Sequence, residues 1–486
     1  MTSESISTLP PAKTKSSHGA RPKVVAILPR GEAIRNFVYT GALDHLAERG
    51  DVAVVSIKPN EEIWKLLANS YRELFPLDEL RERWLTNFLR ENLDLSHGRW
   101  LWCEAARERW RLRDQEADTT GKRFKRWAKK LACYPFASRP GLELLSKMER
   151  KVSRALQTTN QYEELYKKLK PSLVFNGSHI HSPRAMQAVQ AAQWLGIPTA
   201  TFIFSWDNLT SQGRIMPPYD YYLVWSEGIA KQLLEIYKNV RPEQVFVTGT
   251  PQFDFHVNPK FYLSREEFCA RVGADPARPI ILYSTGMANH MEGEEIVLEN
   301  IAKMIRSMYD LGRPQLLVRL YAKDRNPERF DAMRRRCPDV LFPETLWETN
   351  FQTPKPEDSY LLVNTLRHSA LGINVASTVS LELAMFDKPV INVSYLAAGL
   401  KVLFDYRRYY EYEHYKPVVD SGGIMVAHDE AQMEKMIRKA LTEPQADQKP
   451  RRDLIHSMFG KSLDGRAGER VADLLLDLAT RKKCCD

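Results

Sequence analysis

The stretch Asn374–Val393, NVASTVSLELAMFDKPVINV, carries the strongest local pattern in this chain of 486 residues. Its first residues close a buried strand, a helix opens at Ser377 and Thr378, and Pro389–Val393 fits the next strand. Ser or Thr at a helix start can cap the helix, and the free N–H groups there bind phosphate. We expect Glu382, one turn further along the same face, to reach a ribose hydroxyl. The alternative is an ordinary N-cap followed by a structural glutamate.

Short apolar runs, of the kind buried in a parallel sheet, recur on both sides of this stretch. In the C-terminal half they predict strands at Pro279–Ser284, Gln315–Leu320, Asp339–Phe342, Leu371–Ala376, Pro389–Val393 and Gly423–Ala427. In the N-terminal half they predict strands at Lys23–Leu28, Asp51–Ile57, Ser172–Asn176, Thr199–Phe204, Tyr221–Trp225 and Val245–Thr248. The two series indicate an α/β protein with two Rossmann-like domains facing each other across a cleft, and ligands at the carboxyl ends of the strands.

The domain boundaries follow from the same pattern. We predict one Rossmann-like domain over residues 21–255, a second over 262–450, and a C-terminal helix over 451–480 that returns to the first domain. Residues 1–20 are rich in Ser, Thr, Lys and Pro and predict a disordered leader rather than a secretory signal. From about 61 to 169 strand-like runs give way to helical spacing, which predicts a helical insertion in the first domain.

The net charge of +9 is concentrated in one segment of this insertion. Eleven bases and two acids lie between Gly121 and Arg154, so these residues account for the whole basic surplus. Phe124, Trp127 and Leu131 form an apolar stripe at helical spacing, and the bases beside it include Lys125, Arg126, Lys129 and Lys130. Such a helix suits docking on an anionic membrane. The alternative is that Trp127 packs into the insertion and the bases form a solvated face; no recognised nucleic-acid module surrounds them.

The quoted stretch resembles the nucleotide-binding element of GT-B glycosyltransferases, in which S-T-x-x-x-E is followed by D-K-P-V-I. Further segments, in the same order along the chain, resemble bacterial surface and capsular polysaccharide transferases: SWDNLTSQGR at Ser205–Arg214, YLVWSE at Tyr222–Glu227, VFVTGTPQFD at Val245–Asp254, and LDGRA at Leu463–Ala467. The resemblance covers about residues 21–57 and 170–480. It implies that the first domain binds the acceptor and the second the nucleotide donor.

The donor site is expected in the second domain. Thr285 and Gly286, after the strand Pro279–Ser284, are candidates for a phosphate loop, and Arg319 and Lys323 are candidate phosphate cations. Ser377, Thr378 and Glu382 complete the donor-binding set. The chain contains no Asp-x-Asp, so we expect transfer without a metal and no other cofactor. Helix N-termini and basic side chains would then neutralise the leaving diphosphate.

The acceptor side carries the candidate base. Many retaining relatives have a Glu where this chain has Asn374, which favours an inverting transfer with a general base. His179 and Asp207 are the candidates for this base, and His181 is a further one. The alternatives are hydrogen-bonded loop histidines and an Asp-Asn turn pair. Additional acceptor-side candidates are Glu32, Arg35, Asn36 and Asn208.

These observations predict a glycosyltransferase that moves a sugar from a nucleotide-sugar to a lipid-linked or envelope glycan. The six cysteines are scattered and form no C-x-x-C pair, which favours a reducing cytoplasm. We therefore expect the protein to be cytoplasmic and peripheral at the inner face of the cell membrane. One alternative is transfer of glycerol phosphate from CDP-glycerol. Another is a non-hydrolysing sugar-nucleotide 2-epimerase, a family that His290 and Glu292 resemble in part. A third is a non-catalytic membrane scaffold.

Overall fold

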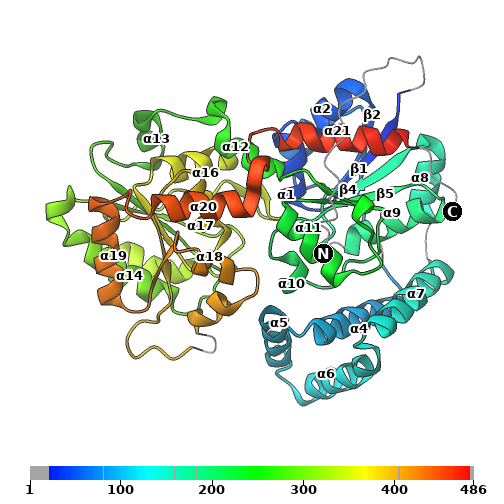
Figure 1. Ribbon diagram of the computed structural model, residues 1–486, viewed down its shortest axis with the longest axis horizontal. Helices are drawn as coiled ribbons and strands as arrows, with labels where there is room; N and C mark the ends of the chain where they lie inside the picture. The colour runs from blue at the N-terminus through cyan, green and yellow to red at the C-terminus, as the bar shows by residue number, and fades with distance from the viewer. Residues whose placement is uncertain (1–20, 80, 158–159, 181–182, 403–404, 482–486) are drawn as a thin grey trace, which may run out of the picture. The chain divides into compact units, whose positions relative to one another are not determined.

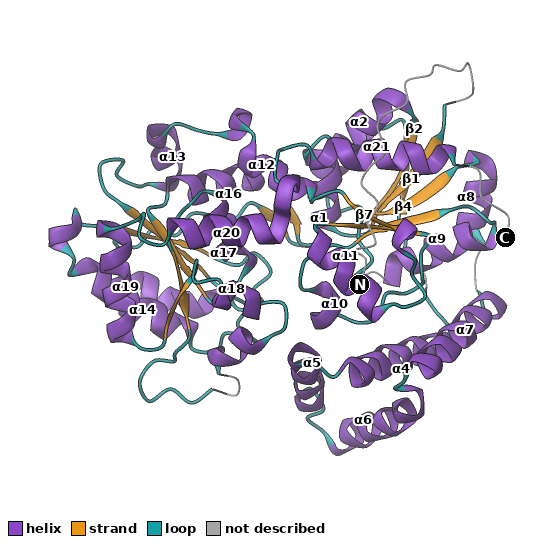
Figure 2. Ribbon diagram, viewed as in Figure 1, coloured by secondary structure: helices purple, strands orange, loops and turns teal. Residues whose placement is uncertain are grey.

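A computed structural model describes residues 21–79, 81–157, 160–180, 183–402 and 405–481 of this chain (Figure 1). The predicted leader at 1–20 and His181 lie outside the described residues. The chain divides into two compact units. The first unit comprises residues 1–252 and 466–486, and the second comprises residues 253–465. Each contains a parallel sheet with helices around it (Figure 2), so the predicted fold class, α/β with two Rossmann-like domains, is confirmed.

The first unit is built on a seven-stranded parallel sheet in the order β3-β2-β1-β4-β5-β6-β7. The strands are β1 (Lys23–Leu28), β2 (Asp51–Ser56), β3 (Glu73–Pro76), β4 (Leu173–Asn176), β5 (Thr199–Phe202), β6 (Tyr221–Val224) and β7 (Val245–Val247). The central strands are almost wholly buried, which explains their continuous apolar runs.

Helices flank this sheet. They are α1 (Gly31–Ile34), the π-helix η1 (Arg35–Tyr39), α2 (Ala42–Arg49), α3 (Glu61–Ser70), α8 (Gln161–Leu169), α9 (Pro183–Trp194), α10 (Asn208–Ser211), α11 (Glu227–Ile236) and α21 (Ala467–Thr480). Helix α21 comes from the end of the chain and contacts α2, β1 and β4. The part of the predicted returning helix that belongs to the first unit therefore begins after Gly465.

Four consecutive helices form the insertion: α4 (Trp84–Leu101), α5 (Glu104–Gln115), α6 (Thr120–Cys133) and α7 (Arg139–Ala155). The predicted insertion, about 61–169, was too long at both ends. Its first part holds β3, which pairs with β2, and its last part holds α8, which packs against α9. A buried ion pair between Arg90 of α4 and Glu149 of α7 fastens the two long helices together.

The second unit is built on a five-stranded parallel sheet in the order β14-β13-β12-β8-β9. Its strands are β8 (Ile280–Ser284), β9 (Gln315–Arg319), β12 (Leu371–Asn374), β13 (Val390–Val393) and β14 (Met425–Ala427). The strand predicted at Asp339–Phe342 is wrong, since only Leu341 forms a bridge, to Leu317. A separate antiparallel pair consists of β10 (Trp347–Glu348) and β11 (Thr353–Pro354).

The helices of the second unit are α12 (Asp254–Val257), α13 (Arg265–Val272), α14 (Glu294–Arg306), α15 (Asp331–Arg336), α16 (Pro356–His368), α17 (Thr378–Met385), α18 (Lys416–Asp420), α19 (Glu430–Thr442) and α20 (Gln448–Phe459). Helix α20 packs against α17, so residues 451–459 of the predicted returning helix stay with the second unit. Among the helices described in both units, none is long and apolar enough to cross a bilayer.

Candidate functional site

The carboxyl ends of β8 and β12 lie side by side in the second unit. Ser284 and Asn374, the last residues of these strands, are partners in the parallel register. The chain passes from β8 to β9 on one side and later returns to β12 on the other side of β8. This arrangement makes the gap between the two strand ends a topological switch point, which is where ligands bind in open α/β sheets. The loops after Ser284 and Asn374 therefore frame the candidate site.

The loop after β8 is held by hydrogen bonds within the protein. The N–H of Thr285 donates to the carbonyl of Arg319 (3.1 Å), and its hydroxyl accepts from the N–H of Tyr321 (2.9 Å). The N–H of Gly286 donates to both carboxylate oxygens of Glu294, each at 3.0 Å. These two N–H groups are thus used internally. A phosphate at this loop would have to bind other donors or displace the Glu294 carboxylate.

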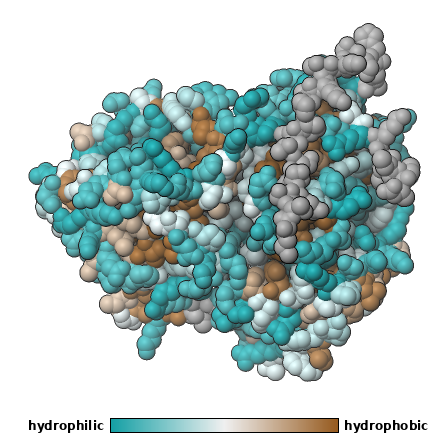
Figure 3. All heavy atoms as spheres, viewed as in Figure 1, coloured by the Kyte–Doolittle hydropathy of each residue, from teal (hydrophilic) through white to brown (hydrophobic). Residues whose placement is uncertain are grey.

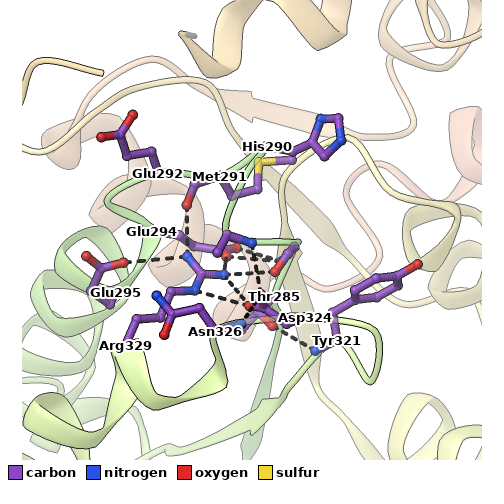
Figure 4. A network of polar contacts seen from close by, with 12 residues as sticks. Thr285, His290, Met291, Glu292, Glu294, Glu295, Tyr321, Asp324, Asn326 and Arg329 are labelled. Carbon is purple, nitrogen blue, oxygen red and sulfur yellow. Dashed lines mark hydrogen bonds and ion pairs between the residues drawn. The ribbon is translucent and has the colours of Figure 1, made fainter. Parts of the chain in front are cut away.

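Glu294 is the centre of a buried polar network at the start of α14 (Figure 4). Its carboxylate is fully buried, and burial raises the pKa of Glu294 to about 7 in spite of the nearby Arg329 guanidinium. Arg329 donates to Glu294 (2.9 Å), to Asp324 (3.0 Å) and to the carbonyls of Gly286 and Met291, both at 2.8 Å. This single guanidinium therefore ties the loop after β8 to the segment after β9.

His290 lies on the same loop but outside this network. Its ring points away from the Glu294–Arg329 pair (Figure 4), and its Nδ1 is 3.2 Å from the hydroxyl of Tyr409 in η8 (Tyr406–Glu411). Burial and the charge of Arg408 lower the pKa of His290. A neutral imidazole can accept a proton at neutral pH.

The loop after β12 is organised by Asn374. Its side-chain oxygen accepts from the N–H of Ser377 (3.2 Å), the hydroxyl of Ser380 (3.0 Å) and the amide of Asn392 (3.1 Å). The side chain of Ser377 in turn caps α17 by accepting from the N–H of Val379 (3.3 Å). The sequence-predicted cap is therefore present. Asn374 is fully buried and has a structural role in this loop.

Thr378 and Glu382 lie on α17, one turn apart. The carboxylate of Glu382 is 3.7 Å from Nε2 of His256 on α12, and both side chains are almost wholly buried. His256 also packs edge-on against Phe253 and lies beside Phe386. Glu382 therefore has an imidazole partner from the segment that opens the second unit, which the sequence did not suggest.

The two predicted phosphate cations differ in their surroundings. Arg319 at the end of β9 forms a 2.7 Å ion pair with Asp358 of α16, whose carboxylate is buried and also accepts from the indole N–H of Trp347. Arg319 is thus engaged with Asp358, and its role as a phosphate cation stays a prediction. The ammonium of Lys323 lies 5.7 Å from the centre of the Trp347 ring, in a cation–π contact.

In the first unit, Glu32, Arg35 and Asn36 follow β1 at the carboxyl edge of the sheet. Glu32 is buried and forms an ion pair with Arg30 (3.0 Å). Arg35 donates to the side-chain oxygens of Asn36 (3.0 Å) and Gln252 (2.5 Å) at the start of the π-helix η1. The amide nitrogen of Asn36 is buried without a hydrogen-bond partner among the described residues, a position in which a ligand acceptor would satisfy it.

His179 and Asp207 follow the neighbouring strands β4 and β5. Nδ1 of His179 is 3.1 Å from the carbonyl of Phe202, so the ring is held by the end of β5. Asp207 accepts from the hydroxyl of Ser211 and from the amide of Asn208 (3.3 Å), and Asn208 accepts from the N–H of Ser205 (2.6 Å). Asp207 and Asn208 thus form the local turn pair that was the alternative interpretation.

The basic helix α6 shows an unusual orientation. Lys129 pairs with Glu91 of α4, and Arg126 (2.8 Å) and Lys130 (2.5 Å) both pair with Asp114 of α5. These three predicted membrane-docking bases are therefore turned toward the protein, whereas Lys125 has no ion pair among the described residues.

The apolar stripe of α6 faces the opposite way. Phe124, Trp127 and Leu131 are 67%, 57% and 59% exposed, and the rings of Phe124 and Trp127 stack at 5.8 Å. The alternative in which Trp127 packs into the insertion is wrong. Apolar residues reach the surface over α6 and α7 (Figure 3).

Sequence reasoning missed the buried groups of the second unit: Glu294, Arg329, Asp324 and His256. The dipeptide Glu294–Glu295 at the start of α14 was a usable signal, since acidic residues favour the first turn of a helix. The residues with which these groups interact lie far from them in the chain, so no local sequence pattern indicates the contacts. Among the described residues, no group of three or more His, Cys, Asp or Glu side chains could hold a metal ion.

No protein-family model matches this chain, and no curated protein is similar to it in sequence. Solved structures are similar in fold. The UDP-GlcNAc 2-epimerase from Neisseria meningitidis bound to UDP-GlcNAc is 13% identical, with 94% of this chain and 100% of that chain covered and a TM-score of 0.50. The enzyme of that name from Methanocaldococcus jannaschii is 14% identical, with 93% and 99% covered and a TM-score of 0.52. A further UDP-N-acetylglucosamine 2-epimerase is 15% identical, with 96% and 98% covered and a TM-score of 0.53. At these identities the likeness shows the GT-B-like fold alone.

Proposed function

We propose that this protein is an enzyme that binds a nucleotide-sugar at the carboxyl ends of β8 and β12. The observation that carries the proposal is the register pairing of Ser284 with Asn374, because it brings the β8 loop and the N-terminus of α17 to one point. The N-terminal end of α17 and the ammonium of Lys323 would face the diphosphate, and Thr378 and Glu382 would contact the nucleoside. The solved structures of similar fold include one with UDP-GlcNAc bound, which fits this class of ligand.

The reaction we propose first is glycosyl transfer to an acceptor on the first unit. His179 is the base we favour, since Asp207 is engaged with Ser211 and Asn208. The last residue of β4 supports transfer over epimerisation. Asn176 is buried and donates to the hydroxyl of Tyr219 (2.8 Å). An amide at this position offers no carboxylate for deprotonating a sugar carbon. Inverting transfer without a metal is the expected mode, because Asn374 is a structural residue.

The second candidate is sugar-nucleotide 2-epimerisation, and the likeness of fold supports it more directly than it supports transfer. In this reaction His290 would be the base, because its neutral ring lies on the β8 loop beside Tyr409. Transfer of glycerol phosphate from CDP-glycerol is a variant of the first reaction with another donor. Each candidate uses the same nucleotide site in the second unit.

One experiment distinguishes these functions. The full chain is first screened for a rise in melting temperature with UDP-, GDP-, CDP- and CMP-linked donors, because a ligand of the folded state stabilises it. The stabilising donor is then incubated with the enzyme alone and followed by NMR. Appearance of the 2-epimer without acceptor establishes the epimerase and overturns glycosyl transfer. A donor that stays intact with the enzyme alone and is consumed only when a glycan acceptor is added establishes the transferase. Failure of every donor to bind leaves only a scaffold and overturns the proposal.

We further propose that the enzyme works peripherally at a cytoplasmic membrane surface, on a lipid-linked or envelope glycan. The exposed stripe of Phe124, Trp127 and Leu131 on α6 would insert at the lipid interface, with Lys125 at the level of anionic head groups. The inward ion pairs of Arg126, Lys129 and Lys130 support this orientation, because they turn the apolar face outward.

A further inference from the structure

A cavity of about 240 Å³ lies in the first unit, between α7 of the insertion and the chain on either side of β6. Three bases line it: Lys147 and Arg150 from α7, and Arg214 from the segment before β6. The hydroxyl-bearing rings of Tyr222 and Tyr237 form part of its wall. Arg214 belongs to the sequence segment Ser205–Arg214, for which the nucleotide-sugar site offers no role.

The positive charge in this cavity is not balanced by the protein. Within the described part of the chain, Lys147, Arg150 and Arg214 have no carboxylate within 4.0 Å, and the one acid in the lining, Glu143, pairs with none of them. Asp94, an acid of the insertion beside His97, is already shared by Arg109 (3.0 Å) and Arg113 (2.9 Å). Three cations thus converge where one acid is present.

Arg214 is held in place by uncharged groups. Its guanidinium lies 5.2 Å from the centre of the Tyr237 ring, and one of its terminal nitrogens is 3.5 Å from Nδ1 of His97. Burial and the charge of Arg214 lower the pKa of His97 to about 3, so the imidazole is neutral and stacks on Tyr237. Partial burial of a cation without a counter-charge is unfavourable, and a bound anion would offset that cost.

We propose that this cavity binds a phosphate or diphosphate group. A guanidinium pair and an ammonium match the oxygens of such a group, and Arg binds phosphate through two parallel N–H donors. The volume is below the range of about 300–1,000 Å³ common for drug-sized ligands, which suits a small anionic head rather than a whole nucleotide. The site is independent of the proposed nucleotide-sugar site, since every lining residue belongs to the first unit.

Two sources of this group share the chemistry: a free phosphate anion and the diphosphate head of a lipid. Helix α7 carries Leu144 and Met148, both exposed, one turn apart on the same helix as Lys147. An apolar tail attached to the bound head would find contacts there. We therefore use inorganic pyrophosphate as the first probe and geranyl diphosphate as the second.

The test is calorimetric titration of the full chain with inorganic pyrophosphate at low salt. The double variant Lys147→Gln/Arg150→Gln should weaken binding by at least about tenfold, because it removes two charged donors to the anion. Both side chains lie at the surface of α7, so the variant should fold as the parent does. The control is Lys151→Gln, an exposed base on the same helix outside the cavity, which should bind as the parent does.

The outcomes separate this proposal from the nucleotide site. Weaker pyrophosphate binding in the double variant, with unchanged binding of the nucleotide donor, supports the cavity. Equal pyrophosphate binding in the parent and the double variant overturns the proposal. This conclusion does not require the variant Arg214→Gln to be stable enough to measure. Tighter binding of geranyl diphosphate than of pyrophosphate, lost in the double variant, identifies a lipid head. Equal binding of the two probes identifies a free anion.

Discussion

The backbone N–H of Gly286 donates to both carboxylate oxygens of Glu294, which lies eight residues further along the chain. The bond closes the loop after β8 on the first turn of α14. Because the carboxylate is also bound by Arg329, the shape of this loop depends on the charge of one buried acid.

The stability of the protein should therefore respond to pH through Glu294. Its pKa in the folded state is about 7, above the ordinary value of 4.5, so the folded state holds the proton more tightly than the unfolded state. Its contribution to stability is complete below about pH 4.5 and is lost as the pH rises to 7. Glu294→Gln removes this dependence, so the variant should gain stability relative to the parent between pH 5 and 8, by at most about 3 kcal/mol.

Denaturant unfolding of parent and variant at pH 5, 6, 7 and 8 measures this difference. Glu295→Gln, one residue further along α14 and partly exposed, is the matched control and should show no such trend. A stability difference that stays constant over this range would refute the assignment of a raised pKa to Glu294.

Arg319 and Lys323 should behave differently when truncated. Arg319→Ala leaves the buried Asp358 carboxylate without its cation, so we expect a loss of about 3–5 kcal/mol in the free energy of unfolding. Lys323→Ala should cost less than about 1 kcal/mol in stability but weaken donor binding about tenfold. Chemical denaturation and calorimetry on both variants check this. If Lys323→Ala binds donor as the parent does, Lys323 has no part in the site.

Asn374 should be a stability residue. Asn374→Ala removes the acceptor of three donors, on Ser377, Ser380 and Asn392, and we expect a loss of about 2–4 kcal/mol. Asn300→Ala on the exposed face of α14, where the amide donates to Glu430, should cost well under 1 kcal/mol. Urea unfolding compares the two, and equal losses would show that the Asn374 bonds are not what holds the loop.

His179 should affect turnover rather than nucleotide binding. If it is the general base, His179→Ala lowers kcat by about 10²–10⁴-fold while the donor Kd stays within twofold. Asp207→Ala removes the acceptor of the Ser211 hydroxyl and should act mainly on stability. Steady-state kinetics with saturating donor test this. Full activity in His179→Ala would remove this residue from the mechanism.

The apolar stripe of α6 should govern binding to vesicles. Trp127→Glu places a charge in the centre of the stripe and should reduce binding to vesicles containing anionic lipid at least about tenfold. Tyr309→Glu, at a similarly exposed aromatic of the second unit, should leave it unchanged. Co-sedimentation at physiological salt provides the measurement. Equal binding by both variants would exclude α6 as the docking element.

The strands were largely predictable because a strand covered on both faces is a continuous apolar run, as at Lys23–Leu28. Two errors show where this pattern fails. Glu73–Pro76 is an edge strand, only partly buried, so its sequence ELFP carries no such run. Asp339–Phe342 has apolar residues that cover the core, but Leu341 alone meets β9.

The candidate site could be predicted from the sequence only where one short segment contains all the residues that form the feature. Ser377 could be recognised as a cap because a cap is set by residues within one helical turn. The pairing of Arg319 with Asp358, 39 residues away, depends on where α16 packs in the folded unit. The burial that raises the pKa of Glu294 likewise depends on the whole second unit. Neither this burial nor the Arg319–Asp358 pair can be recognised from a pattern in the local sequence.

Helix α21 has a consequence for the order of folding during synthesis. It fills a place against α2, β1 and β4, with Val471, Leu474, Leu475 and Leu478 buried there. The first unit therefore stays incomplete until residues 467–480 have left the ribosome, although all of its strands are made before the second unit. The second unit is one continuous segment, 253–465, and can finish earlier. Folding of the first unit during synthesis therefore cannot be completed before the whole of the second unit has been made. A chain that ends before Arg466 has every residue of the second unit but lacks the helix that covers α2, β1 and β4 of the first.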